Sequence, residues 1–285
     1  SLVGSEMCIR DSDMSNATVS RTAYTRPSNF VTSDVTQNIS STTTSQLVLN
    51  VNSSQDANTM AIKNYVIDYK GNDGVTSQDT TATLTPTTTT SNATNNDVTV
   101  TGLLANVTYD LSAHLINNAD LSNSKIGLSA TTRPTNFATN DISQNMTTNV
   151  VTTNSVTLST KHKDVTGSLD ISGYNLTYEV QGGNTDTGSV TKTATNKAAT
   201  ASNNDVTITG LQYPNANYTV TAHLFNTQDM SNATVSRTAY TRPSDFANND
   251  VTQNTTTTTS SQLVLNVNNS QDANTMDISG YVIDY

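Results

Sequence analysis

The sequence is short of the residues on which most active sites and disulfide frameworks depend. Its 285 residues include no Trp, three His and a single Cys, Cys8. One cysteine excludes an intrachain disulfide framework and a cysteine-based metal site. No apolar run approaches the roughly 20 residues of a membrane span, so we expect no membrane insertion.

Charge is also scarce, and it is mostly of one sign. Charged residues make up 13% of the chain, and the formal net charge is −10. An acidic surface repels phosphate backbones and anionic lipid headgroups, so we expect neither a nucleic acid nor an anionic membrane as a partner.

Small polar residues are what the chain has in abundance. Thr, Ser and Asn supply 55, 32 and 36 residues. Such a bias is also found in disordered chains. Here, however, Tyr and β-branched residues recur at every second position, which is typical of half-buried strands. We therefore expect thin cores with polar outer faces.

The chain is built from an internal repeat. "TRP" occurs three times, with Pro27, Pro134 and Pro243, at spacings of 107 and 109 residues. Each unit repeats similar segments in the same order, such as "SQLVLNV", "ISGYVIDY" and "NNDVTITGL". Several short strands per hundred residues, separated by Gly/Asn/Asp turns, predict an antiparallel β-sandwich.

Alternation assigns one face of each predicted strand to the core. In the first unit the residues expected to point inward are Leu47, Leu49, Val51, Tyr65, Ile67, Tyr69, Val98, Val100, Leu103, Tyr109, Leu111, Ala113 and Leu115.

The order "SVTLS…ISGYNLTY…VTITGL…NYTVTAHL…TRP" resembles the fibronectin type III domain, an immunoglobulin-like sandwich of seven strands. The resemblance covers nearly all of 27–285 and implies an all-β fold of tandem seven-stranded antiparallel sandwiches. "TGL" followed by Tyr109 or Tyr218 is similar to the family's tyrosine corner, whose hydroxyl bonds to upstream backbone.

Two departures from the family leave a different immunoglobulin-like sandwich open as an alternative. The family's second strand usually carries a Trp, and Val51, Thr160 and Val267 stand at that position. If Thr160 is buried, its hydroxyl needs a hydrogen-bond partner. The repeat is also longer than is usual in the family.

A longer period indicates duplication of a domain pair. Residues 13–69 align without gaps to 229–285, with 45 of 57 positions identical. The preceding segment, 1–12, has no counterpart and resembles a translated sequencing-linker artefact, although a genuine divergent N-terminus is the alternative. We therefore expect a fragment: a non-native leader (1–12), the last strand of a truncated sandwich (13–26), two fibronectin type III-like domains (27–133 and 134–242), and the first three strands of a truncated third (243–285).

No catalytic constellation is recognisable. His114 and His223 occupy equivalent places that alternation turns outward, and neither has a partner nearby in the sequence. His162 lies in the charged segment "TKHKD", which favours a solvated turn. The chain has no nucleophile elbow, phosphate loop or HExxH motif, so we expect no enzyme.

Oxygen-rich loops suit Ca²⁺, so the acidic turns raise the question of a calcium site. None of these turns has EF-hand spacing, and a lone Asp usually caps a turn through local hydrogen bonds, so we expect no cofactor. The acidic positions concerned are Asp56, Asp73, Asp97, Asp141, Asp205 and Asp250.

Tandem domains, an acidic polar surface and no catalytic motif indicate a non-enzymatic, extracellular or cell-surface repeat region. It would act as a spacer or as an adhesion module for a protein or glycan ligand, with neighbouring repeats of the same chain as its immediate partners. Two alternatives remain: accessory domains of a secreted polysaccharide-active enzyme, and a viral or phage fibre or surface protein.

Overall fold

The computed structural model describes residues 20–53, 56, 59–71, 80–84, 96–147, 150–272 and 275–284. It divides into two compact units. Unit 1 comprises 1–134 together with 165–169, and unit 2 comprises 135–164 together with 170–285.

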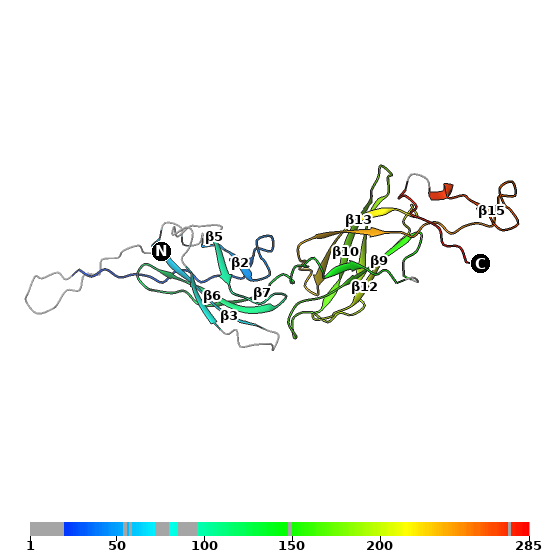
Figure 1. The fold of residues 1–285 in the computed structure, drawn as a ribbon. Helices are drawn as coiled ribbons and strands as arrows, with labels where there is room; N and C mark the ends of the chain where they lie inside the picture. The colour runs from blue at the N-terminus through cyan, green and yellow to red at the C-terminus, as the bar shows by residue number, and fades with distance from the viewer. Residues whose placement is uncertain are drawn as a thin grey trace, which may run out of the picture. The chain divides into compact units, whose positions relative to one another are not determined.

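Unit 1 contains a sandwich of seven antiparallel strands in two sheets (Figure 1). The three-stranded sheet has the order β1-β2-β5, formed by β1 (Val35–Gln37), β2 (Gln46–Val51) and β5 (Asn96–Thr101). The four-stranded sheet has the order β4-β3-β6-β7, formed by β4 (Thr80–Leu84), β3 (Ile62–Gly71), β6 (Thr108–Asn117) and β7 (Ile126–Thr131).

Unit 2 repeats this topology strand for strand. Its three-stranded sheet, β12-β9-β8, consists of β8 (Ile142–Gln144), β9 (Ser155–Thr160) and β12 (Asn204–Thr209). Its four-stranded sheet, β11-β10-β13-β14, consists of β10 (Ile171–Val180), β11 (Thr187–Thr193), β13 (Asn217–Asn226) and β14 (Val235–Tyr240). The predicted fold class, tandem seven-stranded antiparallel sandwiches, is confirmed.

The core of unit 1 follows the predicted alternation. All of the residues assigned inward are buried except Tyr69, which is partly buried and packs against the core. Its ring stands edge-on to that of Tyr109, with centroids 6.1 Å apart. Period-two patterning was a sufficient guide to these residues, although Val48 and Val66, at the alternate positions, are buried as well.

Tyrosines on the third strand of each sandwich occupy much of the core that lacks a Trp. Tyr65 and Tyr174 are 1% and 0% exposed, and both are larger than the residues at the usual Trp position. Thr160 is buried and donates its hydroxyl proton towards Tyr174 Oη (2.8 Å) or the Asn204 carbonyl (3.1 Å). The predicted need for a partner at Thr160 is thus met by two acceptors.

The third repeat differs from the expected three strands. It forms a hairpin of β15 (Val251–Gln253) and β16 (Leu265–Val267), followed by the 3₁₀ turn η2 (Ser270–Asp272). The described residues 278–284 form no strand. In unit 1 the equivalent strand β3 is held between β4 and β6. In the described part of 243–285, no strand pairs with 278–284.

The expected strand over 13–26 is tested only at its end. Residues 1–19 lie outside the described residues, as do Cys8 and the 1–12 leader, and the described residues 20–26 form no strand.

Candidate functional site: a polar groove on the outer sheet face

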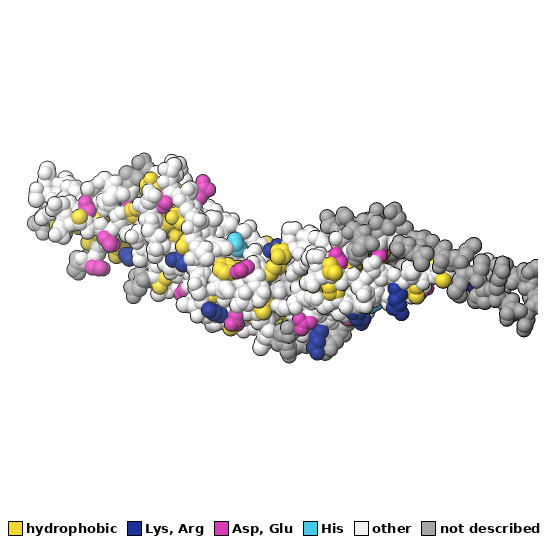
Figure 2. Space-filling view, turned by 180° about the vertical axis from the view of Figure 1, so that it is seen from behind, with side chains coloured by type: hydrophobic (Ala, Val, Ile, Leu, Met, Phe, Trp, Pro, Cys, Tyr) yellow, Lys and Arg dark blue, Asp and Glu magenta, His cyan; other side chains and the backbone are white. Residues whose placement is uncertain are grey.

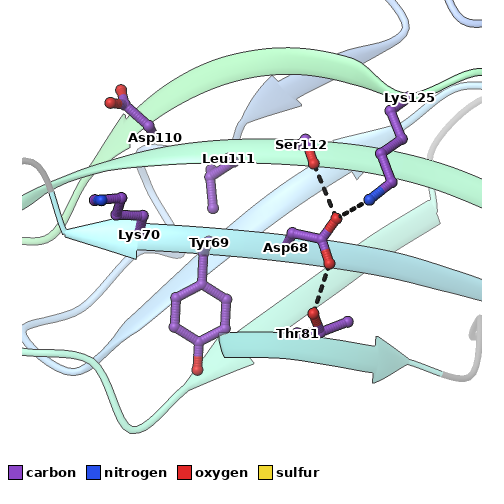
Figure 3. Close-up of a pocket in the computed structure, with 8 residues that line it drawn as sticks. All are labelled: Asp68, Tyr69, Lys70, Thr81, Asp110, Leu111, Ser112 and Lys125. Atoms are coloured by element: carbon purple, nitrogen blue, oxygen red, sulfur yellow. Dashed lines mark hydrogen bonds and ion pairs between the residues drawn. The ribbon is translucent and has the colours of Figure 1, made fainter. Parts of the chain in front are cut away.

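A shallow groove of about 590 Å³ lies on the outer face of the four-stranded sheet of unit 1 (Figure 3). Strands β3, β4 and β6 form its floor, and the segment leading into β7 forms one side. The residues lining it are Asp68, Tyr69, Lys70, Thr81, Asp110, Leu111, Ser112 and Lys125.

Asp68 is the centre of the groove's polar contacts. Its register partners on the two neighbouring strands are Thr81 and Ser112. Thr81 Oγ1 donates to Asp68 Oδ1 (2.6 Å), and Ser112 Oγ donates to Oδ2 (3.1 Å). Lys125 Nζ forms an ion pair with Oδ2, and all three contacts can be followed in Figure 3.

These donors stabilise the ionised carboxylate. The hydrogen bond from Lys125, and then that from Thr81, lower the pKa of Asp68 to about 2. A carboxyl group that remains ionised throughout the neutral range is a poor general acid, and its lone pairs are already engaged, so it is also a poor base. Asp68 can therefore offer hydrogen bonds and charge to a polar ligand, but it is itself poorly suited to acid–base catalysis.

His114 lies on the same outer face of β6, where alternation placed it. Partial burial, and then the positive charge of Lys125, lower its pKa, while Asp68 acts in the opposite direction. Its Nδ1 atom is buried and has no hydrogen-bond partner among the described residues. His223, the equivalent residue on β13, contacts Asn175 Nδ2 through Nε2 (3.2 Å).

A groove of about 380 Å³ occupies the same sheet face in unit 2, but its chemistry differs. Thr177 takes the place of Asp68, since it pairs with Ser189 and Thr221 in the corresponding register. Thr234, which precedes β14, takes the place of Lys125. The ion pair of unit 1 is therefore not a repeated feature, although the groove is.

Sequence reasoning did not single out Asp68 or Lys125. The available signal was a charged residue at an outward position in mid-strand, flanked in "VIDYK" by residues assigned to the core. Pairing it with Lys125, 57 residues away, required the sheet register.

Figure 2 shows acidic and basic side chains scattered over one face whose exposed atoms are mainly uncharged polar groups and backbone. Among the described residues, no three His, Cys, Asp or Glu side chains gather as metal ligands would. Over the same residues, no helix has the length and hydrophobicity needed to cross a bilayer.

The two tyrosines predicted at the corner position are fully buried at the start of β6 and β13. Tyr109 Oη accepts a hydrogen bond from Leu104 N (2.8 Å), and Tyr218 Oη accepts one from Tyr213 N (3.1 Å). Tyr218 also donates to Asp186 Oδ2 (2.8 Å). Burial is the main cause of its raised pKa. These contacts hold a turn to a strand, which is a structural role.

The expectation of a solvated turn at His162 is wrong. The side chain is 5% exposed. Its Nδ1 lies 2.7 Å from the Ala198 carbonyl, and its Nε2 is hydrogen-bonded to Tyr174 Oη. The flanking Lys161 and Lys163 are exposed, so the sequence is polar on both sides of a buried ring. Ala198, the residue that covers one ring nitrogen, is 36 positions away, beyond the reach of local pattern.

Four of the acidic residues considered for calcium accept hydrogen bonds, Asp141 and Asp250 from nearby residues and Asp56 and Asp205 from residues distant in the sequence. Asp141 Oδ2 accepts from Ala138 N and Asp250 Oδ2 from Ala247 N, each at 2.6 Å. Asp56 accepts from Ser28 N (3.0 and 3.2 Å). Asp205 accepts from Ser159 Oγ and from Asn145 Nδ2. Asp97 is exposed, and Asp73 lies outside the described residues.

Comparison with known proteins gives matches of structure only. No family model matches the chain, and no curated protein sequence matches it. A two-domain fibronectin type III segment of chicken tenascin is similar at 16% identity, covering 73% of this chain and 98% of that one, with a TM-score of 0.36. The FN1–FN3 domains of chicken CNTN1 are similar at 13% identity, covering 78% and 71%, with a TM-score of 0.38. The fold assignment rests on the strand order of each sandwich.

Proposed function

We propose that this chain is a non-catalytic, extracellular repeat region that serves as a spacer or adhesion module within a larger surface protein. The proposal rests on a glutamine side chain that hydrogen-bonds the first strand of each complete sandwich to its last strand. The supporting contacts are the same in both units.

In unit 1 the Gln37 side chain pairs with the main chain of Thr131. Gln37 Nε2 donates to the Thr131 carbonyl (2.8 Å), and Thr131 N donates to Gln37 Oε1 (3.0 Å). In unit 2 Gln144 and Tyr240 form the same pair at 2.7 and 2.8 Å. The amide thus reproduces the two-bond exchange of an antiparallel residue pair and bridges the two sheets.

This bridge lies where a spacer would carry tension. In a tandem array, force enters each sandwich at its first strand and leaves at its last, which are β1 and β7 in unit 1. Hydrogen bonds joining those strands oppose their separation, and they break only after both sheets begin to part.

The segment that leads into each sandwich is fastened as well. Asn123 Nδ2 donates to the Ser28 carbonyl (3.0 Å), and Asp56 accepts from Ser28 N. In unit 2 Asn232 Nδ2 donates to the Thr135 carbonyl (3.0 Å), and Asp164 accepts from Thr135 N (2.9 Å). These hydrogen bonds hold the segment that leads into each sandwich. Together with a weakly charged exterior rich in Thr, Ser and Asn, they suit a solvated array outside the cell.

Stretching the whole chain between its ends by single-molecule force spectroscopy tests the proposal. We expect two discrete unfolding steps, each releasing about 30 nm of contour length, because each sandwich spans roughly a hundred residues at about 3.5 Å per extended residue. Gln37→Ala should lower the force of one step and Gln144→Ala that of the other. Gln181→Ala, at an exposed position, is the matched control and should change neither.

A chain that extends without discrete steps would contradict a mechanical spacer. Equal effects of all three alanine substitutions would contradict the role given to the glutamine bridge.

A further inference from the structure

Two asparagines adopt a backbone conformation that few residues tolerate. Asn106 and Asn215 have φ angles of 60° and 50°, and they occupy the turn before β6 and before β13. Asn is one of the few non-glycine residues for which this left-handed region is accessible at modest cost. Both side chains are almost fully buried, with exposures of 0% and 3%.

In unit 2, Asn215 binds the segment that leads into the third repeat. Its Nδ2 donates to the Met276 carbonyl (2.6 Å) and to Thr275 Oγ1 (3.0 Å). In return, Met276 N donates to the Asn215 carbonyl (2.9 Å). Asn215 and Met276 thus exchange two hydrogen bonds, one through a side chain and one through the main chain.

In unit 1, Asn106 makes the same exchange with Leu169, within the segment 165–169 that belongs to this unit. Asn106 Nδ2 donates to the Leu169 carbonyl (2.6 Å), and Leu169 N donates to the Asn106 carbonyl (2.9 Å). Ser168 Oγ adds a bond to the Ala105 carbonyl (3.3 Å). Leu169 and Met276 hold the same place, two residues before Ile171 and Ile278.

Each asparagine also donates a main-chain hydrogen bond to a carbonyl of its own repeat. Asn106 N donates to the Arg133 carbonyl (3.0 Å), and Asn215 N donates to the Arg242 carbonyl (2.8 Å). These arginines stand in the "TRP" sequence that ends each repeat. The main-chain amide therefore fixes the turn, while the side chain and carbonyl are directed to the following segment.

We propose that this turn is a docking surface whose partner is the segment before the third strand of the following repeat, and that the asparagine closes it as a two-bond clasp. Asparagine suits the role because it combines a short amide donor with tolerance of a positive φ. The inference goes beyond the proposed function, since it assigns the anchoring of this segment to one residue whether or not the array bears load.

Amide hydrogen exchange, measured by NMR on the whole chain, tests the clasp at Leu169 and Met276. Asn106→Asp keeps the shape and the tolerance of positive φ, but it replaces the donor with an oxygen that repels the Leu169 carbonyl. We expect exchange at Leu169 to become about tenfold faster, as for the loss of a hydrogen bond worth about 1.4 kcal/mol, with Met276 unchanged. Asn215→Asp should do the converse.

Asn106→Gly provides a second variant, because glycine adopts the same φ and removes only the side chain. It should accelerate exchange at Leu169 while leaving the strand amides of β6 protected. The clasp is overturned if Leu169 in the unaltered chain exchanges as fast as a free peptide, or if either Asp substitution affects both amides equally. Neither result would alter the forces expected for the Gln37 and Gln144 variants, so the two proposals fail separately.

Discussion

At the scale of single residues, hydrogen-bonded polar groups share the core of unit 2 with aliphatic side chains. Tyr174 Oη contacts Thr160 Oγ1 and His162 Nε2, and burial raises the pKa of Tyr174 to about 12. Unit 1 has Val51 and Ser53 where unit 2 has Thr160 and His162. The position of Thr160, where the resembled family usually has a Trp, indicated that its hydroxyl would need a partner if it were buried. It did not predict His162, because that partner comes from outside the strand pattern.

The buried His162 should make the stability of unit 2 depend on pH. Burial lowers its pKa, and the opposing effects of the Ala198 carbonyl and the nearby Asp164 are smaller. Near pH 6, the unfolded chain therefore binds more protons at this residue than the folded one does, so stability is full above the unfolded pKa of about 6.5 and falls as the pH drops below it. Urea denaturation followed through the β9 and β10 amides should show a lower midpoint at pH 5.5 than at pH 7.5.

His162→Gln supplies the comparison, because His114 and His223 also have lowered pKa values and remain in both proteins. The substituted chain should lose part of this pH dependence. An unchanged dependence would mean that His162 does not titrate on unfolding.

At the scale of elements, register decides which side chains meet. Strands β3 and β10 each shift register once against their partner, between Ile62 and Asn64 and between Ile171 and Gly173. The sequence predicted both strands and the inward face of β3, but it carried no sign of these irregularities. They arise from fitting two long strands together, which local propensity does not encode.

Gly173 is a position where packing between elements leaves no room for a side chain. A Cβ atom there would lie 2.3 Å from the Lys192 carbonyl oxygen and 3.0 Å from the Phe225 ring. Gly173→Ala should therefore destabilise unit 2 by about 1–3 kcal/mol, because the obstructing atom belongs to a neighbouring strand's backbone. Gly127→Ala, also in a strand, is the control, since its nearest neighbour would be 3.9 Å away. Equal denaturation midpoints for the two variants would contradict this account.

At the scale of the whole molecule, one repeated sequence has two different structures. Residues 13–69 and 229–285 are largely identical, yet Leu47 and Ile67 are fully buried while Leu263 and Ile283 are 62% and 54% exposed. The β15–β16 hairpin keeps the register of β1 and β2, with Val251 opposite Val267 as Val35 is opposite Val51. Local pairing thus survives in the third repeat, whereas the third strand does not form.

Hydrogen exchange should separate these two copies in one experiment. The amides of 278–284 should exchange within a few tenfold of free-peptide rates, because no strand pairs with them, while those of β3 should be protected. Strong protection over 278–284 in a monomeric sample would show that this segment finds a partner that the described residues do not include.

The sequence by itself determined the fold class, the repeat and most of the core, because alternation, turn residues and tandem similarity are local or periodic signals. Only the tertiary structure decided the burial of His162, the pairing of Asp68 with Lys125, the glutamine bridges and the asparagine clasps. Each of these joins residues separated by tens of positions, and their meeting depends on sheet register and on how one repeat is followed by the next. The Asn and Gln side chains, which as composition suggested only a polar exterior, form hydrogen bonds that join these segments in the structure.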